Sequence, residues 1–187
     1  MNIKITYFIL LFSASTIFSQ IEGYDKLRPA LVVMKSGDTL NNILGQLKSK
    51  HFKYKKYYSG KSIKISFNEI DRVEFKLSKT HTRIFHILPI QGKNKLIAVQ
   101  RFVTGNKVNL YGIVGRYGNS ILYYIQEISE NQITELGSYS PPFGKIKDKL
   151  KILFSDCDLL LSKIENREFK VRSDIIQMFI FYNDECK

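Results

Sequence analysis

The chain has 187 residues, 44% of them hydrophobic, which is the size of a single domain with a sizeable hydrophobic core. Its 29 lysines and arginines exceed its 17 aspartates and glutamates and give a formal net charge of +12. Such an excess attracts anionic partners but carries no information about the fold. The alternative is a surface that uses lysine for solubility alone.

The N-terminal segment is typical of a secretory signal peptide. Lys4 supplies a positive charge, residues 5–18 are mostly apolar, and Ser19-Gln20 ends the run with a small residue. The apolar run is shorter than the ~20 residues that cross a bilayer, which disfavours an uncleaved anchor. We therefore expect residues 1–19 to be removed and the mature chain, without an integral membrane segment, to be periplasmic or secreted. Cytosolic nucleic acid is then excluded as a partner.

Residues 30–139 have the pattern of a β-rich body. Short runs rich in Val, Ile, Tyr and Phe alternate with turn residues such as Ser59-Gly60 and Thr104-Gly105-Asn106, which suit tight hairpins. We expect strands over residues 30–35, 52–58, 62–67, 72–77, 83–90, 96–103, 108–114, 121–128 and 133–139. Residues 20–140 would then form an antiparallel body, either a bent sheet or a small barrel.

Residues 33–44 also resemble the opening of a LysM peptidoglycan-binding module, and residues 60–65 imitate its closing strand. The two helices of that module need more chain than lies between Leu44 and Gly60. We therefore favour an ordinary hairpin that turns at Gly37-Asp38.

The period of the pattern changes after Ser140-Pro141-Pro142. Apolar residues recur at helical spacing from Ile146 onward, with lysines between them. Ser155 and Ser173-Asp174 have the composition of helix starts, because hydroxyls and carboxylates satisfy the free N–H groups there. Residues 141–187 are expected to form a two- or three-helix unit packed on the body, and the fold class is α+β.

The chain contains two cysteines, Cys157 and Cys186. An exported protein folds in an oxidising compartment, where a disulfide is expected. Cys157 lies in the first turn of one expected helix and Cys186 just past the end of the next, so antiparallel packing of these helices would bring the two together. The alternative is a buried free Cys157 and an exposed Cys186 at a frayed terminus.

Residues 48–64 combine lysines with aromatic rings and contain no acidic residue. Lysine charges bind phosphate or carboxylate groups, and rings stack on sugars or bases, so the segment is a candidate polyanion-binding surface. The alternative is an edge strand that outward lysines protect from aggregation, with its rings in the core. The candidate binding residues are Lys53, Lys55, Lys56, Lys61, Lys64, Tyr54 and Tyr57.

Catalytic and metal-binding signals are weak. The three histidines, His51, His81 and His86, do not form a ligand pattern, because a metal site needs at least three converging ligands. Glu69, Asp71 and Glu74 could pair for hydrolysis, but they lie close together in one turn, which favours a solvated loop. The sequence has no nucleophile elbow, zinc-protease motif, phosphate loop or dinucleotide fingerprint. We expect no cofactor, no metal and no catalytic residue.

A layout of short motifs runs along the chain. It consists of Lys35-Ser36-Gly37-Asp38-Thr39-Leu40, residues 63–70, Phe154-Ser155-Asp156-Cys157 and Phe181-Tyr182-Asn183, behind a signal that ends at Gln20. This layout resembles a group of exported Bacteroidetes proteins of unknown function over nearly the whole mature chain. The resemblance implies an envelope or secreted location, a β-rich front and a helical tail, and it assigns no activity to any residue.

These patterns favour an exported, non-enzymatic protein that binds an anionic envelope polymer or an envelope protein through its basic, aromatic-rich β surface. One alternative is a hydrolase that acts on envelope polymer. Another is a subunit of an envelope assembly, in which a sheet edge pairs with a partner strand.

Overall fold

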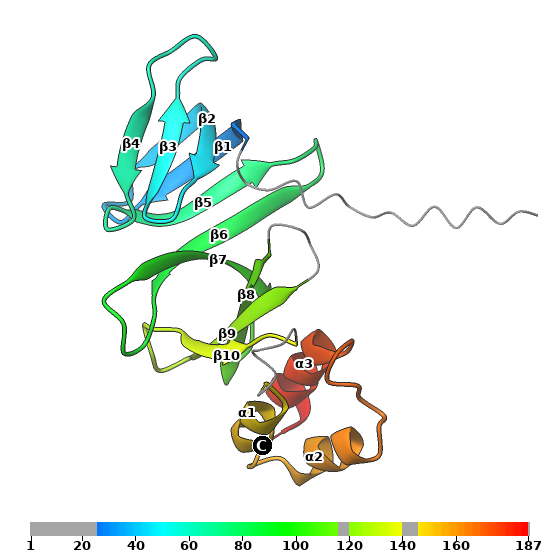
Figure 1. Cartoon of the computed structure of the whole chain (residues 1–187). Helices are drawn as coiled ribbons and strands as arrows, with labels where there is room; N and C mark the ends of the chain where they lie inside the picture. Colours follow the sequence, from blue (N-terminus) through cyan, green and yellow to red (C-terminus); the bar gives the residue numbers. More distant parts are fainter. Residues whose placement is uncertain (1–25, 116–119, 140–145, 187) are drawn as a thin grey trace, which may run out of the picture.

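The computed structural model describes residues 26–115, 120–139 and 146–186. The expected signal peptide, residues 1–19, lies outside this range. Ten strands precede three helices (Figure 1). The strands are β1 (Arg28–Met34), β2 (Thr39–Leu47), β3 (His51–Lys55), β4 (Ile63–Ser66), β5 (Ile70–Lys76), β6 (Thr82–Pro89), β7 (Leu96–Val103), β8 (Val108–Val114), β9 (Ile121–Glu127) and β10 (Thr134–Gly137). The helices are α1 (Ile146–Leu153), α2 (Asp158–Glu165) and α3 (Ile175–Glu185).

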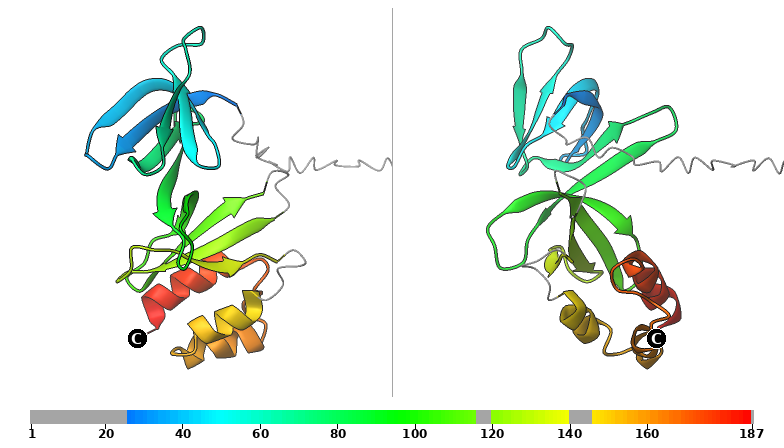
Figure 2. Two further views of the ribbon diagram at one scale, coloured as in Figure 1. Left: turned by 60° about the vertical axis from the view of Figure 1, so that its left-hand side comes forward. Right: turned by 45° about the vertical axis from the view of Figure 1, so that its right-hand side comes forward.

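All ten strands belong to one antiparallel sheet, in the order β10-β9-β8-β7-β6-β5-β1-β2-β3-β4. Each strand pairs with its neighbour in the chain except at one place, where β5 pairs with β1 instead of β4. The sheet therefore has an upper half, β1 to β5, and a lower half, β6 to β10, and the helices cover the lower half (Figures 1 and 2). The expected α+β class is confirmed, and the body is a bent, open sheet.

One face of this sheet carries two separate hydrophobic clusters. In the upper half, β1 to β4 curl over the start of β5 and β6, and their apolar residues surround Phe52, Val73 and Phe75. In the lower half, the same face contributes Leu110 and Ile125 to a cluster that the helices complete. The opposite face of the lower half carries a third cluster, and a single parallel bridge between Ile90 and Ile133 draws the two ends of that half together.

The first hairpin corrects the expected strand pattern. The sequence pattern predicts no strand over residues 39–47, but these residues form β2, which pairs with β1 across the turn at Gly37. Gly37 has a φ of +92°, a conformation that glycine adopts without steric cost. A LysM module would need a helix where β2 lies, so the ordinary hairpin is the correct interpretation.

The start of α2 differs from the expected one, whereas α3 begins directly after Ser173-Asp174, as expected. Helix α2 begins at Asp158 with Cys157 as its N-cap, and Ser155 lies in the preceding turn instead of capping the helix. Asp174 is the N-cap of α3, but its carboxylate accepts a hydrogen bond from the Lys170 N–H at 2.8 Å. This bond lowers the pKa of the Asp174 carboxyl. The Asp174 carboxylate therefore stabilises the loop before α3 instead of the first turn of that helix.

A disulfide joins Cys157 and Cys186, whose Cα atoms are 5.5 Å apart. Cys157 precedes α2 and Cys186 is the C-cap of α3, so the start of one helix lies beside the end of the other, as expected. On the chain-entropy model, closing a loop between residues 29 apart stabilises the fold by about 3.6 kcal/mol. The bridge is consistent with folding in an oxidising compartment.

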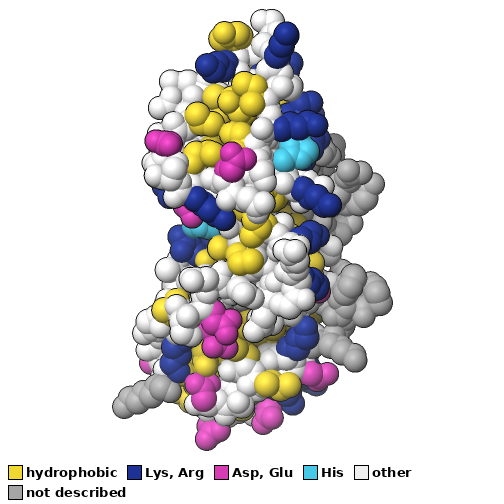
Figure 3. All heavy atoms as spheres, turned by 90° about the vertical axis from the view of Figure 1, so that its left-hand side faces the viewer, with side chains coloured by type: hydrophobic (Ala, Val, Ile, Leu, Met, Phe, Trp, Pro, Cys, Tyr) yellow, Lys and Arg dark blue, Asp and Glu magenta, His cyan; other side chains and the backbone are white. Residues whose placement is uncertain are grey.

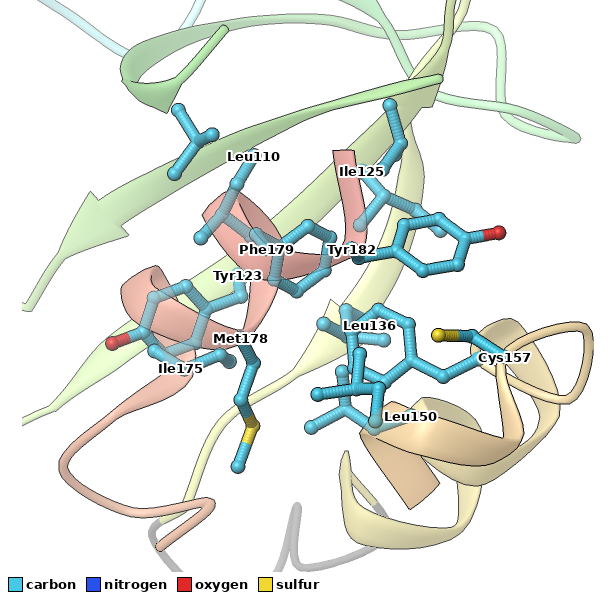
Figure 4. Close-up of a cluster of buried hydrophobic side chains, with 14 of the residues drawn as sticks. Leu110, Tyr123, Ile125, Leu136, Leu150, Cys157, Ile175, Met178, Phe179 and Tyr182 are labelled. Carbon is cyan, nitrogen blue, oxygen red and sulfur yellow. The ribbon is translucent and has the colours of Figure 1, made fainter. Parts of the chain in front are cut away.

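Helix α3 is the main contact between the helices and the sheet. Its Met178, Phe179 and Tyr182 belong to the same buried cluster as Leu110 of β8 and Tyr123 of β9 (Figure 4). The Asn183 side chain, 4% exposed, adds polar contacts to the turn between β7 and β8. Its Oδ1 accepts hydrogen bonds from the N–H groups of Lys107 and Val108, both at 3.0 Å. Its Nδ2 donates to the carbonyls of Val108 and Phe179.

Candidate functional site

The predicted polyanion-binding residues lie mainly on the outward side of β3 and β4. Lys53 and Lys64 are directly opposite partners in the β3–β4 ladder, and Lys55 lies two residues further along the same side of β3. Alternation along the strands places these lysines away from the upper cluster. We call this side of β3 and β4, together with the loop of residues 56–62, the basic strand surface.

The loop of residues 56–62 extends the basic strand surface beyond the strands. Lys56 and Lys61 are exposed, and the side chains of Tyr57 and Tyr58 are 66% and 76% exposed. The Lys55 ammonium donates a hydrogen bond to the Tyr58 carbonyl at 3.1 Å, which ties the loop back to β3. The loop therefore presents two accessible rings beside the lysines.

Tyr54 does not belong to the basic strand surface. It is 8% exposed and belongs to the upper cluster, where its ring centroid lies 6.3 Å from that of Phe52 in a stacked arrangement. The prediction that Tyr54 contributes to ligand binding is therefore wrong, because its position in β3 turns it inward. The exposed Tyr58 is the ring that the sequence interpretation left out of the candidate set.

The lysines of the basic strand surface are not paired with any carboxylate that the structure describes. Within the described parts of the chain, Lys53, Lys55, Lys56, Lys61 and Lys64 take part in no ion pair. Figure 3 shows lysine and arginine side chains on the upper half of the molecule, next to an apolar patch. Like charges placed directly opposite each other destabilise a sheet, so the Lys53–Lys64 pair leaves repulsion that a bound anion would relieve.

The carboxylates that could have indicated a hydrolase are engaged elsewhere. Arg72 donates hydrogen bonds to Glu74 at 2.9 Å and to Asp71 at 3.3 Å, and these contacts raise the pKa of its guanidinium. Glu69 accepts a hydrogen bond from the Ser66 N–H at 3.1 Å. Each acid therefore has a structural partner, and the three do not form a pair across a cleft.

The histidines lie apart from one another. His51 is opposite Ser66 on the outward side of β3, and His81 is exposed before β6. His86 lies in β6 against Tyr111 of β8, with the ring centroids 5.9 Å apart. Burial, followed by the positive charge of Arg101, lowers the pKa of His86. Within residues 26–115, 120–139 and 146–186, no three His, Cys, Asp or Glu side chains are placed to hold a metal ion.

A second basic feature, not expected from the sequence, lies between the two halves of the sheet. Four lysines from three turns line a hollow of about 510 Å³, together with Ser66, Asn68 and Asn94. They are Lys35, Lys50, Lys93 and Lys95. We call this space the basic hollow. Figure 3 shows basic side chains on either side of an apolar strip at mid-height, where the two halves meet.

An apolar space adjoins the basic hollow. It has a volume of about 260 Å³, is lined mainly by apolar side chains that include Phe85, Ala98 and Val114, and shares Phe67 and Lys95 with the basic hollow. We call it the apolar hollow. The only sequence signal for either space was the cluster of lysines in Lys93-Asn94-Lys95, because the other lining residues are distant in the chain.

None of the helices in the described ranges has the length and apolar character needed to cross a bilayer. The resemblance to exported Bacteroidetes proteins stays a prediction. Comparison of the chain with protein-family models, with curated proteins and with solved structures gave no match.

Proposed function

We propose that the protein is exported and binds an anionic polymer of the cell envelope through the basic strand surface, without catalysing a reaction. The observation that carries this proposal is the Lys53–Lys64 pair, two like charges placed opposite each other and paired with no carboxylate in the part of the chain that the structure describes. A polymer with regularly spaced phosphate, sulfate or carboxylate groups would neutralise both and release counterions. The export prediction limits its partners to molecules outside the cytosol.

The exposed tyrosine rings favour an acidic polysaccharide over a polyanion without sugar rings. Tyr57 and Tyr58 lie at the end of the basic strand surface, where a sugar ring could stack while its acidic groups contact the lysines. An open strand surface suits an extended polymer, which can make many weak contacts in succession. An acidic glycan is therefore the ligand class that fits both features.

Heparin serves as the probe. In the test variant, Lys53, Lys55 and Lys64 are each replaced by Gln, and the control variant carries the same change at the exposed Lys147, Lys151 and Lys170. Both lose three charges, so general attraction falls equally. We expect the test variant to elute from heparin at clearly lower salt than the control and to show a shallower dependence of log affinity on log salt. Equal elution of the two variants would refute the proposal.

A second candidate function, a subunit of an envelope assembly, is favoured by the position of β4. This strand ends the sheet, and its Ile63 is exposed beside the open edge. A partner strand could add there by backbone hydrogen bonds. Replacing Ile63 by Lys would then dissociate a complex isolated with the wild-type protein, as measured by light scattering, and an unchanged complex would contradict this candidate.

A further inference from the structure

The apolar hollow and the basic hollow meet along one wall, and the fold explains why. The upper cluster and the helix-covered cluster occupy the two ends of one sheet face. Phe85 and Ala98 lie at the border of the upper cluster, and Gly112 continues the same face toward the helix-covered cluster. These residues line the apolar hollow. Next to the apolar hollow, turns from both halves bring their lysines together around the basic hollow. Phe67 and Lys95 belong to both linings.

The residues that line the basic hollow carry an excess of positive charge. Lys93 forms an ion pair with Glu135 at 3.0 Å. Lys35, Lys50 and Lys95 form no ion pair with any residue that the structure describes, and no carboxylate is among the lining residues. Glu69, which follows Asn68 in the chain, is held by the Ser66 N–H. An anionic group with several oxygens would fit these donors.

We propose that the two hollows together bind a single-chain anionic amphiphile. Its hydrocarbon chain would lie against Phe85, Ala98 and Val114, and its phosphate or carboxylate head would contact Lys35, Lys50 and Lys95. Phe67 and Lys95 would contact the junction of chain and head. This site lies away from the lysines of the basic strand surface, so it goes beyond the proposed polymer binding and does not depend on it.

The combination of the two spaces is what selects this class of ligand. An isolated anion would gain nothing from the apolar hollow, and a neutral amphiphile would leave the three lysines uncompensated. The volume of the basic hollow, about 510 Å³, falls in the range of small-molecule sites, whereas the apolar hollow of about 260 Å³ suits one chain and not several. A single hydrocarbon chain with an acidic head satisfies both requirements.

The test measures binding of dodecyl phosphate, below the concentration at which it forms micelles, by isothermal titration calorimetry and native mass spectrometry. Inorganic phosphate measures the contribution of the anionic head alone, and dodecyl maltoside measures that of the hydrocarbon chain with a neutral head. We expect one dodecyl phosphate per protein, with binding at least tenfold tighter than that of either of the other two. Inorganic phosphate binding equally well would mean a plain anion site, and dodecyl maltoside binding equally well would mean nonspecific apolar contact. Either result would overturn the proposal.

Variants then locate the site. Replacing Lys35, Lys50 and Lys95, all exposed, by Gln should weaken dodecyl phosphate binding at least tenfold without disturbing the fold, and A98F should weaken it by filling the apolar hollow. The matched control is the variant with Gln at Lys53, Lys55 and Lys64, which should bind dodecyl phosphate normally while losing heparin affinity. Equal binding by the Lys35, Lys50 and Lys95 variant and this control would overturn the proposal and leave the heparin result unaffected.

Discussion

Replacing Asn183 by alanine tests the polar contacts that hold α3 against the turn between β7 and β8. The change removes the amide that satisfies the N–H groups of Lys107 and Val108 and the carbonyl of Val108. A buried polar group without a partner costs about 1–3 kcal/mol, and the turn at Lys107 is only partly buried, so water recovers part of the loss. We expect the free energy of unfolding to fall by about 3–5 kcal/mol, a large share of the ~5–15 kcal/mol of a typical domain.

Urea unfolding followed by far-ultraviolet circular dichroism measures this loss. The matched control is Asn166→Ala, which removes an exposed asparagine whose Nδ2 donates a single long hydrogen bond, 3.4 Å, to the Ser162 hydroxyl. That change should stay within about 0.5 kcal/mol. A loss below about 1 kcal/mol for Asn183→Ala would refute the reasoning, because it would mean that the turn groups find other partners without the amide.

Three further predictions concern stability. Replacing Cys157 and Cys186 together by Ser should lower the free energy of unfolding by about 3.6 kcal/mol and make the urea midpoint insensitive to dithiothreitol. A variant with the same urea midpoint as the wild-type protein would show that the disulfide does not stabilise the fold. Burial, followed by the positive charge of Arg101, lowers the pKa of His86 in the folded protein. The unfolded chain therefore protonates this histidine more readily than the folded protein does. The free energy of unfolding is then highest above pH 6.5 and decreases as the pH falls toward the pKa of the folded protein. H86L should therefore flatten the dependence of unfolding free energy on pH between about 7 and 5, and an identical slope would contradict this. Gly45→Ala would place a methyl group against the buried ring of Phe52 and should cost about 1–3 kcal/mol, seen as a lower melting temperature; a wild-type value would mean that the ring moves freely.

The strand pattern from the sequence succeeded wherever apolar residues alternate and failed at β2, for identifiable reasons. Asn41, Asn42 and Gly45 have low strand propensity, and Asn42 has a positive φ of 53°. The register between β1 and β2 shifts between Ala30 and Val32. Gly45 is nevertheless suited to its place, because the ring of Phe52 occupies the space that a side chain would need. Tertiary packing therefore accounts for a strand that local propensity does not support.

The basic strand surface could be predicted in part, because side chains alternate between the two faces of a strand. Alternation in Phe52-Lys53-Tyr54-Lys55 already separates rings from lysines, and the structure places Phe52 and Tyr54 in the upper cluster and the lysines outside. Tyr57 lies past the end of β3, where alternation no longer applies, and its ring is exposed. Period-two reasoning thus identifies the face of each residue within a strand but not beyond its ends.

The two hollows depend on topology instead of local sequence. The turns before β2, before β3 and after β4 contribute residues to one side of the basic hollow, facing the turn between β6 and β7. Lysines on these turns converge on a concave space, which suits a compact acidic head. Those on β3 and β4 spread over an open strand surface, which suits an extended polymer. The fold therefore distributes the excess of lysine over two chemically different places, an open strand surface and a concave hollow.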